Sequence, residues 1–180
     1  MTERGVSAAA IALPAVELSR PAVLHFQEFF EAEHARLGRA LYVLTGSQAE
    51  ADEVAQDAMV RVYERWSRVR TMDSPTGYLF RTAMNLHRSR LRQLSVRSRR
   101  QFERDPSPDG MAAVEDRDEL RRLIATLPLG ERQALALVEV LGMSAEQAGE
   151  ILKLEPVSVR VRLSRARAHL RRHVAGRADG

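Results

Sequence analysis

The chain has 180 residues, of which 44% are hydrophobic and 29% are charged, a balance typical of folded proteins and not of disordered ones. It contains no cysteine, which excludes a disulfide scaffold and cysteine-based zinc sites, and no apolar run reaches the roughly 18 residues that a membrane-spanning helix needs. The formal net charge is +4, and Lys153 is the only lysine, so arginine carries nearly all of the positive charge. Arginine binds phosphates and guanines more directionally than lysine does. Arginine-rich codon usage is an alternative explanation for this composition.

An apolar stretch, GVSAAAIALPAVEL, occupies residues 5–18. It has a weak likeness to the core of a signal peptide, but Glu3 offsets the charge of Arg4, and Pro14 interrupts the apolar run. We therefore expect no export signal here and a cytoplasmic protein. Residues 1–23 form an N-terminal extension, for which disorder is one interpretation.

A helical pattern begins at Phe26 and is stopped by Gly46. Ser47, with Glu50 three residues later, is typical of a capping box and predicts the start of a second helix. The apolar stripe of this second helix continues without a break to Val69.

The third helix is predicted to start near Pro75, capped by Asp73 or Ser74, and to continue as TGYLFRTAMNLHRSRLRQL. A run of arginines follows, and then the turn-forming DPSPDG at residues 105–110. A polar segment with proline and glycine between two helical blocks is typical of a linker. No alternating apolar run predicts a strand, so the expected fold is all-α, with two small helical domains joined by a flexible linker.

The second helical block ends in a helix-turn-helix pattern. Its first two stretches end at Pro128 and Gly142, Ser144 caps AEQAGEIL, and Pro156 begins the last helix. Two short helices joined by a turn of about three residues, the second one basic, are typical of this motif.

The last helix carries an apolar stripe on one side and arginines on the other. At 100° per residue, Val159, Leu163 and Ala166 fall on a stripe that can pack on a core. No acidic residue follows Glu155 until Asp179, whereas a helix face that is merely solvated would mix acidic with basic residues. A helix lying on a membrane surface is also disfavoured, because it would need the apolar stripe that packs on the core. The small residues on the opposite side would let the helix enter the major groove of DNA. The candidate base and phosphate contacts are Arg160, Val161, Arg162, Ser164, Arg165 and Arg167.

Several motifs occur in the order found in one bacterial family: SQAEADEVAQDAMVRVYERW, PTGYLFRTAMNLHRSRLR, LPLGERQALALVEVLGMSAEQAGEIL and PVSVRVRLSRARAHLRR. From residue 24 to residue 174 the chain resembles the extracytoplasmic-function (ECF) sigma factors, which are two-domain transcription initiation factors, and within them the actinobacterial SigE-like branch. The resemblance implies sigma region 2 over residues 24–98, a linker over 99–115, sigma region 4 with its helix-turn-helix over 116–175, and a tail over 176–180.

The resemblance also implies partners and the residues that contact them. The second helix would bind the clamp helices of the RNA polymerase β′ subunit through Glu53, Val54, Gln56 and Asp57. The third helix would read the −10 promoter element as separated strands through Asn85, Arg88, Ser89 and Arg92. The preceding loop would bind a flipped base through Arg70, Thr71, Met72 and Asp73. The last helix would read the −35 element, with Arg160, Val161 and Ser164 at the bases, and the helices before it would meet the β flap. An anti-sigma factor is an expected partner, and no cofactor, metal or catalytic residue is implied.

Some positions depart from the family pattern. Lys153 stands where the turn commonly has glycine, so the turn there is expected either to be left-handed and strained or to have a different shape. Val157 and Ser158 replace a more usual Gly-Thr pair, whereas Gly149 holds the usual small position where the two helices approach. These departures bear on the promoter sequence more than on the function.

Other classes of function remain as alternatives from the residues alone. An enzyme is disfavoured, because the five histidines show no metal-ligand spacing beside carboxylates and no glycine-rich phosphate loop is present. The histidines are most simply solvated or interfacial residues. A stand-alone helix-turn-helix regulator with an N-terminal dimerisation or sensor domain is the main alternative, and it would need a palindromic operator. A protein-interaction adaptor is a third hypothesis, which leaves the one-sided arginine distribution without a use.

Overall fold

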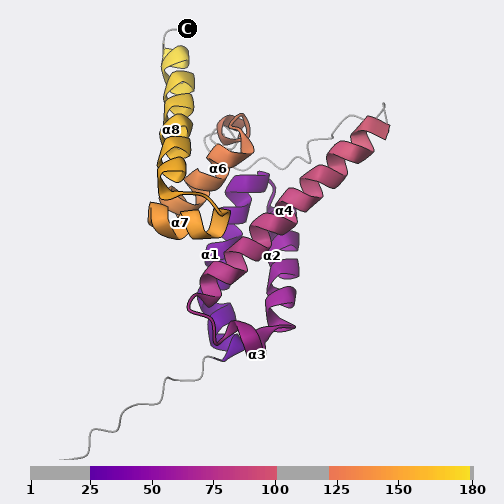
Figure 1. Cartoon of the computed structure of the whole chain (residues 1–180). Coiled ribbons are helices and arrows are strands. Elements are labelled where there is room, and N and C mark those ends of the chain that lie inside the picture. The colour runs from indigo at the N-terminus through magenta and orange to yellow at the C-terminus, as the bar shows by residue number, and fades with distance from the viewer. Residues whose placement is uncertain (1–24, 101–121, 179–180) are drawn as a thin grey trace, which may run out of the picture.

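The computed structural model of the chain describes residues 25–100 and 122–178, and these residues form helices and turns with no strand (Figure 1). The predicted all-α fold is therefore confirmed. Within the described ranges, no helix is both long enough and apolar enough to cross a membrane. The predicted N-terminal extension and nearly all of the predicted linker lie outside the described residues; α4 continues through the first two linker positions.

The first domain consists of α1 (Phe26–Thr45), α2 (Gln48–Tyr63), the single turn α3 (Trp66–Val69) and α4 (Pro75–Arg100). Gly46 ends α1 in the left-handed conformation, with φ 71°. The Ser47 side chain accepts a hydrogen bond from the backbone N–H of Glu50 at the start of α2. Ser74 does the same for Gly77 at the start of α4. These stops and caps lie where the sequence predicts them.

The prediction of one continuous helix from Ser47 to Val69 is wrong. The chain leaves the α2 helix after Tyr63 and resumes as α3 at Trp66. Packing explains the break, because the indole of Trp66 lies against Phe26 and Phe29 of α1, with ring centroids 5.4 Å and 5.0 Å away.

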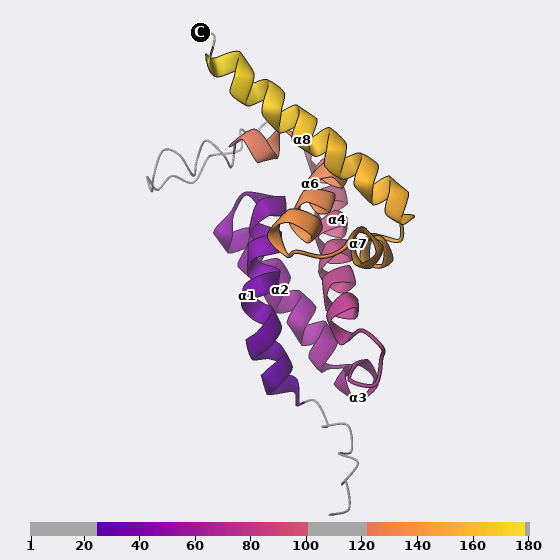
Figure 2. The same ribbon diagram turned by 90° about the vertical axis from the view of Figure 1, so that its left-hand side faces the viewer.

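The second domain contains a turn of helix at residues 122–125, α6 (Leu129–Leu135), the π-helical turn η1 (Ala136–Val140), α7 (Ala145–Leu152) and α8 (Pro156–Ala178). Ser144 forms a reciprocal capping box with Gln147 at the start of α7. The helix α8 packs along α6 and α7 on the outside of the molecule (Figure 2). This arrangement presents one long side of α8 to solvent.

The turn between α7 and α8 depends on two unusual residues. Lys153 adopts the left-handed conformation, with φ 57° and ψ 53°, as expected for a position that commonly holds glycine. Gly149 passes so close to the chain that a Cβ there would lie 2.6 Å from the carbonyl oxygen of Leu154. The small residue is therefore required by a backbone contact.

The two domains pack against each other in this structure. Contacts join α4 to α7 and α1 to both α6 and η1, and one continuous hydrophobic core extends through both domains. Arg132 of α6 donates a hydrogen bond to the carbonyl oxygen of Leu44 at 2.9 Å, and Arg81 of α4 donates one to the carbonyl oxygen of Glu150 at 2.8 Å. The sequence did not predict this closed arrangement, which we call the domain interface.

Candidate nucleic-acid and partner interfaces

The exposed side of α8 forms the first candidate interface. The inner stripe is buried, with Val159 and Ala166 fully inaccessible and Leu163 8% exposed. The side chains of Val161 and Ser164 are exposed on the other side. Since the stripe is occupied by the core, the exposed side is available for a partner, as the sequence predicts.

The arginines of α8 differ in their surroundings. Arg165 is exposed, and the guanidinium of Arg162 lies over Gly130 at the start of α6. Arg160 forms an ion pair with Glu146 of α7 at 3.0 Å, and Arg167 forms one with Glu139 of η1. Two predicted DNA contacts are therefore paired with acids of their own domain.

The pKa of the Glu146 carboxyl is held below its usual range. The causes are the hydrogen bond from its own backbone N–H, then the hydroxyl of Ser144 and the guanidinium of Arg160. The carboxylate of Glu146 therefore stays ionised beside Arg160, and it would compete with a DNA phosphate for this guanidinium.

The second candidate interface lies along α4. Asn85 and Arg92 are exposed, whereas Arg88 and Ser89 are half-buried. The Nε atom of Arg88 is fully buried without a hydrogen-bond partner among the described residues. The structure thus brings all four predicted −10 residues to one side of α4 but leaves them unequally accessible.

The predicted base-binding loop between α3 and α4 is mostly exposed. Arg70, Thr71 and Asp73 are exposed, and the hydroxyl of Thr71 donates a hydrogen bond to the carbonyl oxygen of Arg68 at 2.8 Å. Met72 instead packs against the hydrophobic core. The half-buried Met72 therefore holds the loop in place while its neighbours face solvent.

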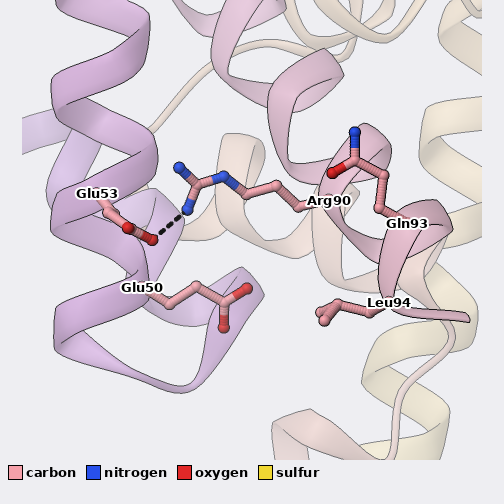
Figure 3. Close-up of a pocket in the computed structure, with 5 residues that line it drawn as sticks. All are labelled: Glu50, Glu53, Arg90, Gln93 and Leu94. Carbon is pink, nitrogen blue, oxygen red and sulfur yellow. Dashed lines mark hydrogen bonds and ion pairs between the residues drawn. The ribbon is translucent and has the colours of Figure 1, made fainter. Parts of the chain in front are cut away.

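The third candidate interface is the surface of α2, and its predicted residues point in different directions. Glu53 and Asp57 both accept hydrogen bonds from Arg90 of α4, at 2.5 Å and 2.7 Å. Figure 3 shows Arg90 reaching Glu53 across a cavity of about 320 Å³ that Glu50, Gln93 and Leu94 also line. Gln56 is exposed on the side of α2 that faces α1.

Val54 has a different position from the other predicted polymerase contacts. It is fully buried in the core of the first domain, because it lies on the inner stripe of α2. The structure corrects the sequence on this point: Val54 can position α2 but offers no surface to a partner in this conformation.

Several residues at these interfaces were not predicted from the sequence. Arg90 draws together the two acidic residues of α2, and hydrogen bonds to these acids raise its pKa although burial opposes this. Arg132 bonds across the domain interface, and its charge acts on His87 of α4. The expectation that every histidine is solvated or interfacial does not cover His87, which is 1% exposed with neither ring nitrogen bonded among the described residues. No spacing in the sequence distinguishes Arg90 or Arg132 from the other arginines.

Burial lowers the pKa of the His87 imidazole, and the positive charges of Arg132 and Arg90 lower it further. Burial also lowers the pKa of the Arg132 guanidinium. His87 is therefore a buried and neutral side chain of α4.

Comparison with known proteins places both domains in one family. Residues 29–97 match sigma-70 region 2, and residues 117–170 match sigma-70 region 4. The chain is 28% identical over 148 residues to the ECF RNA polymerase sigma factor SigM of Mycobacterium tuberculosis, covering 82% of this chain and 76% of that protein. It is 27% identical over 157 residues to the RNA polymerase sigma-E factor of Streptomyces coelicolor, covering 86% and 89%.

Solved structures share the fold. One is the sigma factor RpoE in complex with the anti-sigma factor NepR from Bartonella quintana, with a TM-score of 0.69 and 18% identity over 83% of this chain and 96% of that chain. Another is CnrH in complex with the cytosolic domain of CnrY, with a TM-score of 0.62 and 21% identity over 84% and 88%. The match of residues 29–97 to region 2 also removes the basis for a sensor or dimerisation domain in a stand-alone regulator. Regions 2 and 4, in this order and together covering most of the chain, show that it belongs to the ECF sigma factors of bacterial RNA polymerase.

Proposed function

We propose that this sigma factor directs core polymerase to promoters through three of its surfaces: α8 at the −35 element, α4 with the loop before it at the −10 element, and α2 at the polymerase clamp. The observation that carries the proposal is the exposed side of α8. It combines small residues at its centre with arginines around them, on a helix whose inner stripe is buried.

The chemistry of α8 suits the major groove. The Val161 side chain, 45% exposed, can contact a thymine methyl group, and the Ser164 hydroxyl can bond to a base edge. Arg160 and Arg165 can form paired hydrogen bonds to guanine or to phosphate oxygens, while Arg162 and Arg167 would hold phosphates of the DNA backbone. We expect the first two arginines to affect sequence preference and the other two to affect affinity for any duplex.

The first domain would bind separated strands and polymerase. Asn85 and Ser89 supply amide and hydroxyl groups for bases, whereas Arg88 and Arg92 supply charge for phosphates. Glu53, Gln56 and Asp57 would contact the β′ clamp helices. Arg70, Thr71 and Asp73 would surround a flipped base, on a loop held by the half-buried Met72.

The proposal has consequences for chemistry and location. The polymerase makes the phosphodiester bonds, and this chain supplies no catalytic group of its own. It would act in the cytoplasm, where the polymerase is. An anti-sigma factor is a proposed partner, because the sigma factor RpoE, which shares the fold, was solved in complex with the anti-sigma factor NepR.

The test is reconstituted transcription. We would combine the purified chain with bacterial core polymerase and a genomic promoter library, and map the transcript starts. Starts that share two spaced elements, lost with Asn85→Ala or Arg160→Ala but kept with Arg39→Ala on the exposed side of α1, would support the proposal. Tight binding to palindromic DNA without polymerase, together with no binding to core, would overturn it.

A further inference from the structure

An apolar groove lies between α1 and α2, close to the proposed polymerase-binding surface. It has a volume of about 630 Å³, and its apolar lining includes Phe26, Phe30, Met59, Val60 and Tyr63. The side chains of Tyr63, Val60 and Phe30 are 63%, 48% and 38% exposed. Large apolar side chains gathered around one groove on a surface are typical of a binding site.

The rings in the groove are held in fixed positions by each other. The Phe26 ring lies edge-on to Tyr63, with centroids 4.9 Å apart, and tilted to Phe30 at 6.3 Å. Phe30 in turn stacks against His34 at 4.8 Å. The groove is therefore a preformed surface, which an apolar chain segment can cover without rearranging it.

The sequence carries an apolar segment a few residues before the helix α1 that lines this groove. Residues 5–18 contain ten side chains from the set Ala, Val, Ile and Leu, and Glu17 is their only charged residue. We infer that residues 5–18 bind in the groove between α1 and α2 and regulate access of the polymerase to α2. Burial of Ile11, Leu13 and Val16 there would remove apolar surface from water on both sides.

The connection is long enough for this contact. Seven residues separate Leu18 from Phe26, where the groove begins. Seven residues span up to about 25 Å when extended. The part of α1 from Phe26 to His34 is only about 12 Å long at 1.5 Å per residue. The segment can therefore turn back and follow α1 along the whole groove.

The segment has an advantage over an occupant from another molecule. A short connection holds it at an effective concentration in the millimolar range, so a weak contact is enough to fill the groove for much of the time. The part of the chain that the structure describes leaves the side chains of Tyr63, Val60 and Phe30 exposed. Residues 5–18 are the apolar segment nearest to them along the sequence, and are therefore the first candidate to cover them.

This inference rests on the proposed function, because it assigns a regulator to the same surface. Gln56 is both a proposed polymerase contact and a residue that lines the groove. A polymerase that binds α2 at Gln56 would therefore have to displace the segment. If the groove is occupied nine-tenths of the time, the apparent affinity for polymerase is lowered about tenfold.

Contact between the segment and the groove can be tested without polymerase. The chain has no cysteine, so Ala12→Cys with Val60→Cys places one pair of thiols across the proposed contact. Mild oxidation should give an intramolecular disulfide in the full-length chain. The matched control pairs Ala12→Cys with Arg61→Cys, one residue along α2 on an exposed position outside the groove. Equal trapping of both pairs, no trapping, or a disulfide between two chains would overturn the inference.

The regulatory effect is measured by the Kd for core polymerase. Ile11→Asp with Leu13→Asp should release the segment and tighten binding by up to about tenfold. The control adds two acids at polar positions outside the segment, Thr2→Asp with Ser19→Asp, and should leave the Kd unchanged. Trapping with an unchanged Kd would overturn the regulatory role. Trapping in a chain that does not bind core would instead contradict the proposed function.

Discussion

Gly38 of α1 and Gly149 of α7 are both helical glycines, but their surroundings give the same substitution opposite expected effects. A Cβ at Gly38 would meet no atom within 4 Å, so Gly38→Ala should raise the free energy of unfolding by up to about 1 kcal/mol through helix propensity. A Cβ at Gly149 would press on the backbone oxygen of Leu154, so Gly149→Ala should lower it by about 1–3 kcal/mol. Urea unfolding of both variants measures the difference, and equal effects would contradict the close approach.

His87 should make stability depend on pH. Because its pKa in the folded chain lies below the ordinary value of 6.5, the unfolded chain binds a proton first as the pH falls. The stability is fully present above pH 6.5 and is lost below it, until the folded form is protonated as well. The loss reaches at most about 1.4 kcal/mol at pH 5.5.

The measurement compares urea midpoints of the natural chain and His87→Leu between pH 7.5 and pH 5.5. Leucine removes the titrating group and its two unbonded nitrogens, so the variant should show the smaller change. The other histidines are common to both proteins and cancel in this comparison. The same pH dependence in both would show that His87 does not titrate differently on folding.

At the scale of elements, the local signals of the sequence predict most helix boundaries. Gly46, Ser47, Ser74 and Ser144 end or cap helices where expected, because each acts through its own backbone or hydroxyl group on nearby residues. These features could be predicted because they depend on a few neighbours in the chain.

Two elements could not be predicted, because distant contacts determine them. The break between α2 and α3 falls at Glu64 and Arg65, which are good helix formers on their own. The Arg65 side chain instead donates a hydrogen bond to the hydroxyl of Tyr78, 13 residues away. The π-helical turn η1 likewise lies where α1 packs, within a uniformly helical sequence.

The acids that face α8 should limit its affinity for DNA. Glu146 and Glu139 pair with Arg160 and Arg167, so their negative charges lie beside the proposed phosphate contacts. Glu139→Gln with Glu146→Gln should tighten binding of the full chain to non-specific duplex DNA by a few-fold at low salt, on the order of the effect of one added phosphate contact.

Fluorescence anisotropy at two salt concentrations measures this effect. The control, Glu31→Gln with Glu64→Gln, changes the net charge equally at exposed positions on the first domain. An equal gain in the control would show that net charge, and not the pairing on α8, limits binding. A steeper salt dependence in the first variant alone would agree with freed arginines.

At the scale of the whole molecule, the sequence predicts two domains but not their closure. The composition of the linker indicates that the chain has two separate domains, but it does not indicate whether these domains pack against each other. The interface itself uses backbone carbonyls as acceptors, at Leu44 and Glu150, and a carbonyl has no sequence signature. The exposure of Val161 and Ser164 on α8 could be predicted from the helical period, whereas the half-buried state of Arg88 depends on how the whole chain packs.

Two arginines should hold the domains together. Leu44 lies in the last turn of α1 and Glu150 in the last turn of α7, where carbonyl groups and the helix dipole favour a cation. Arg132 and Arg81 therefore each place a charge from one domain on a helix end of the other. Hydrogen bonds to charged groups contribute about 1.5–3 kcal/mol each, and inter-domain contacts of this kind are readily shifted.

Arg81→Met with Arg132→Met keeps an unbranched side chain that matches the aliphatic part of arginine and removes both bonds, and should open the domain interface. Fluorophores on cysteines at positions 61 and 155, both exposed and in different domains, report the distance in the otherwise cysteine-free chain. Energy transfer should fall in the double variant and stay high with Arg39→Met on the exposed side of α1. Unchanged transfer would mean that the shared apolar core, which includes Met84 and Leu137, holds the domains closed without these arginines.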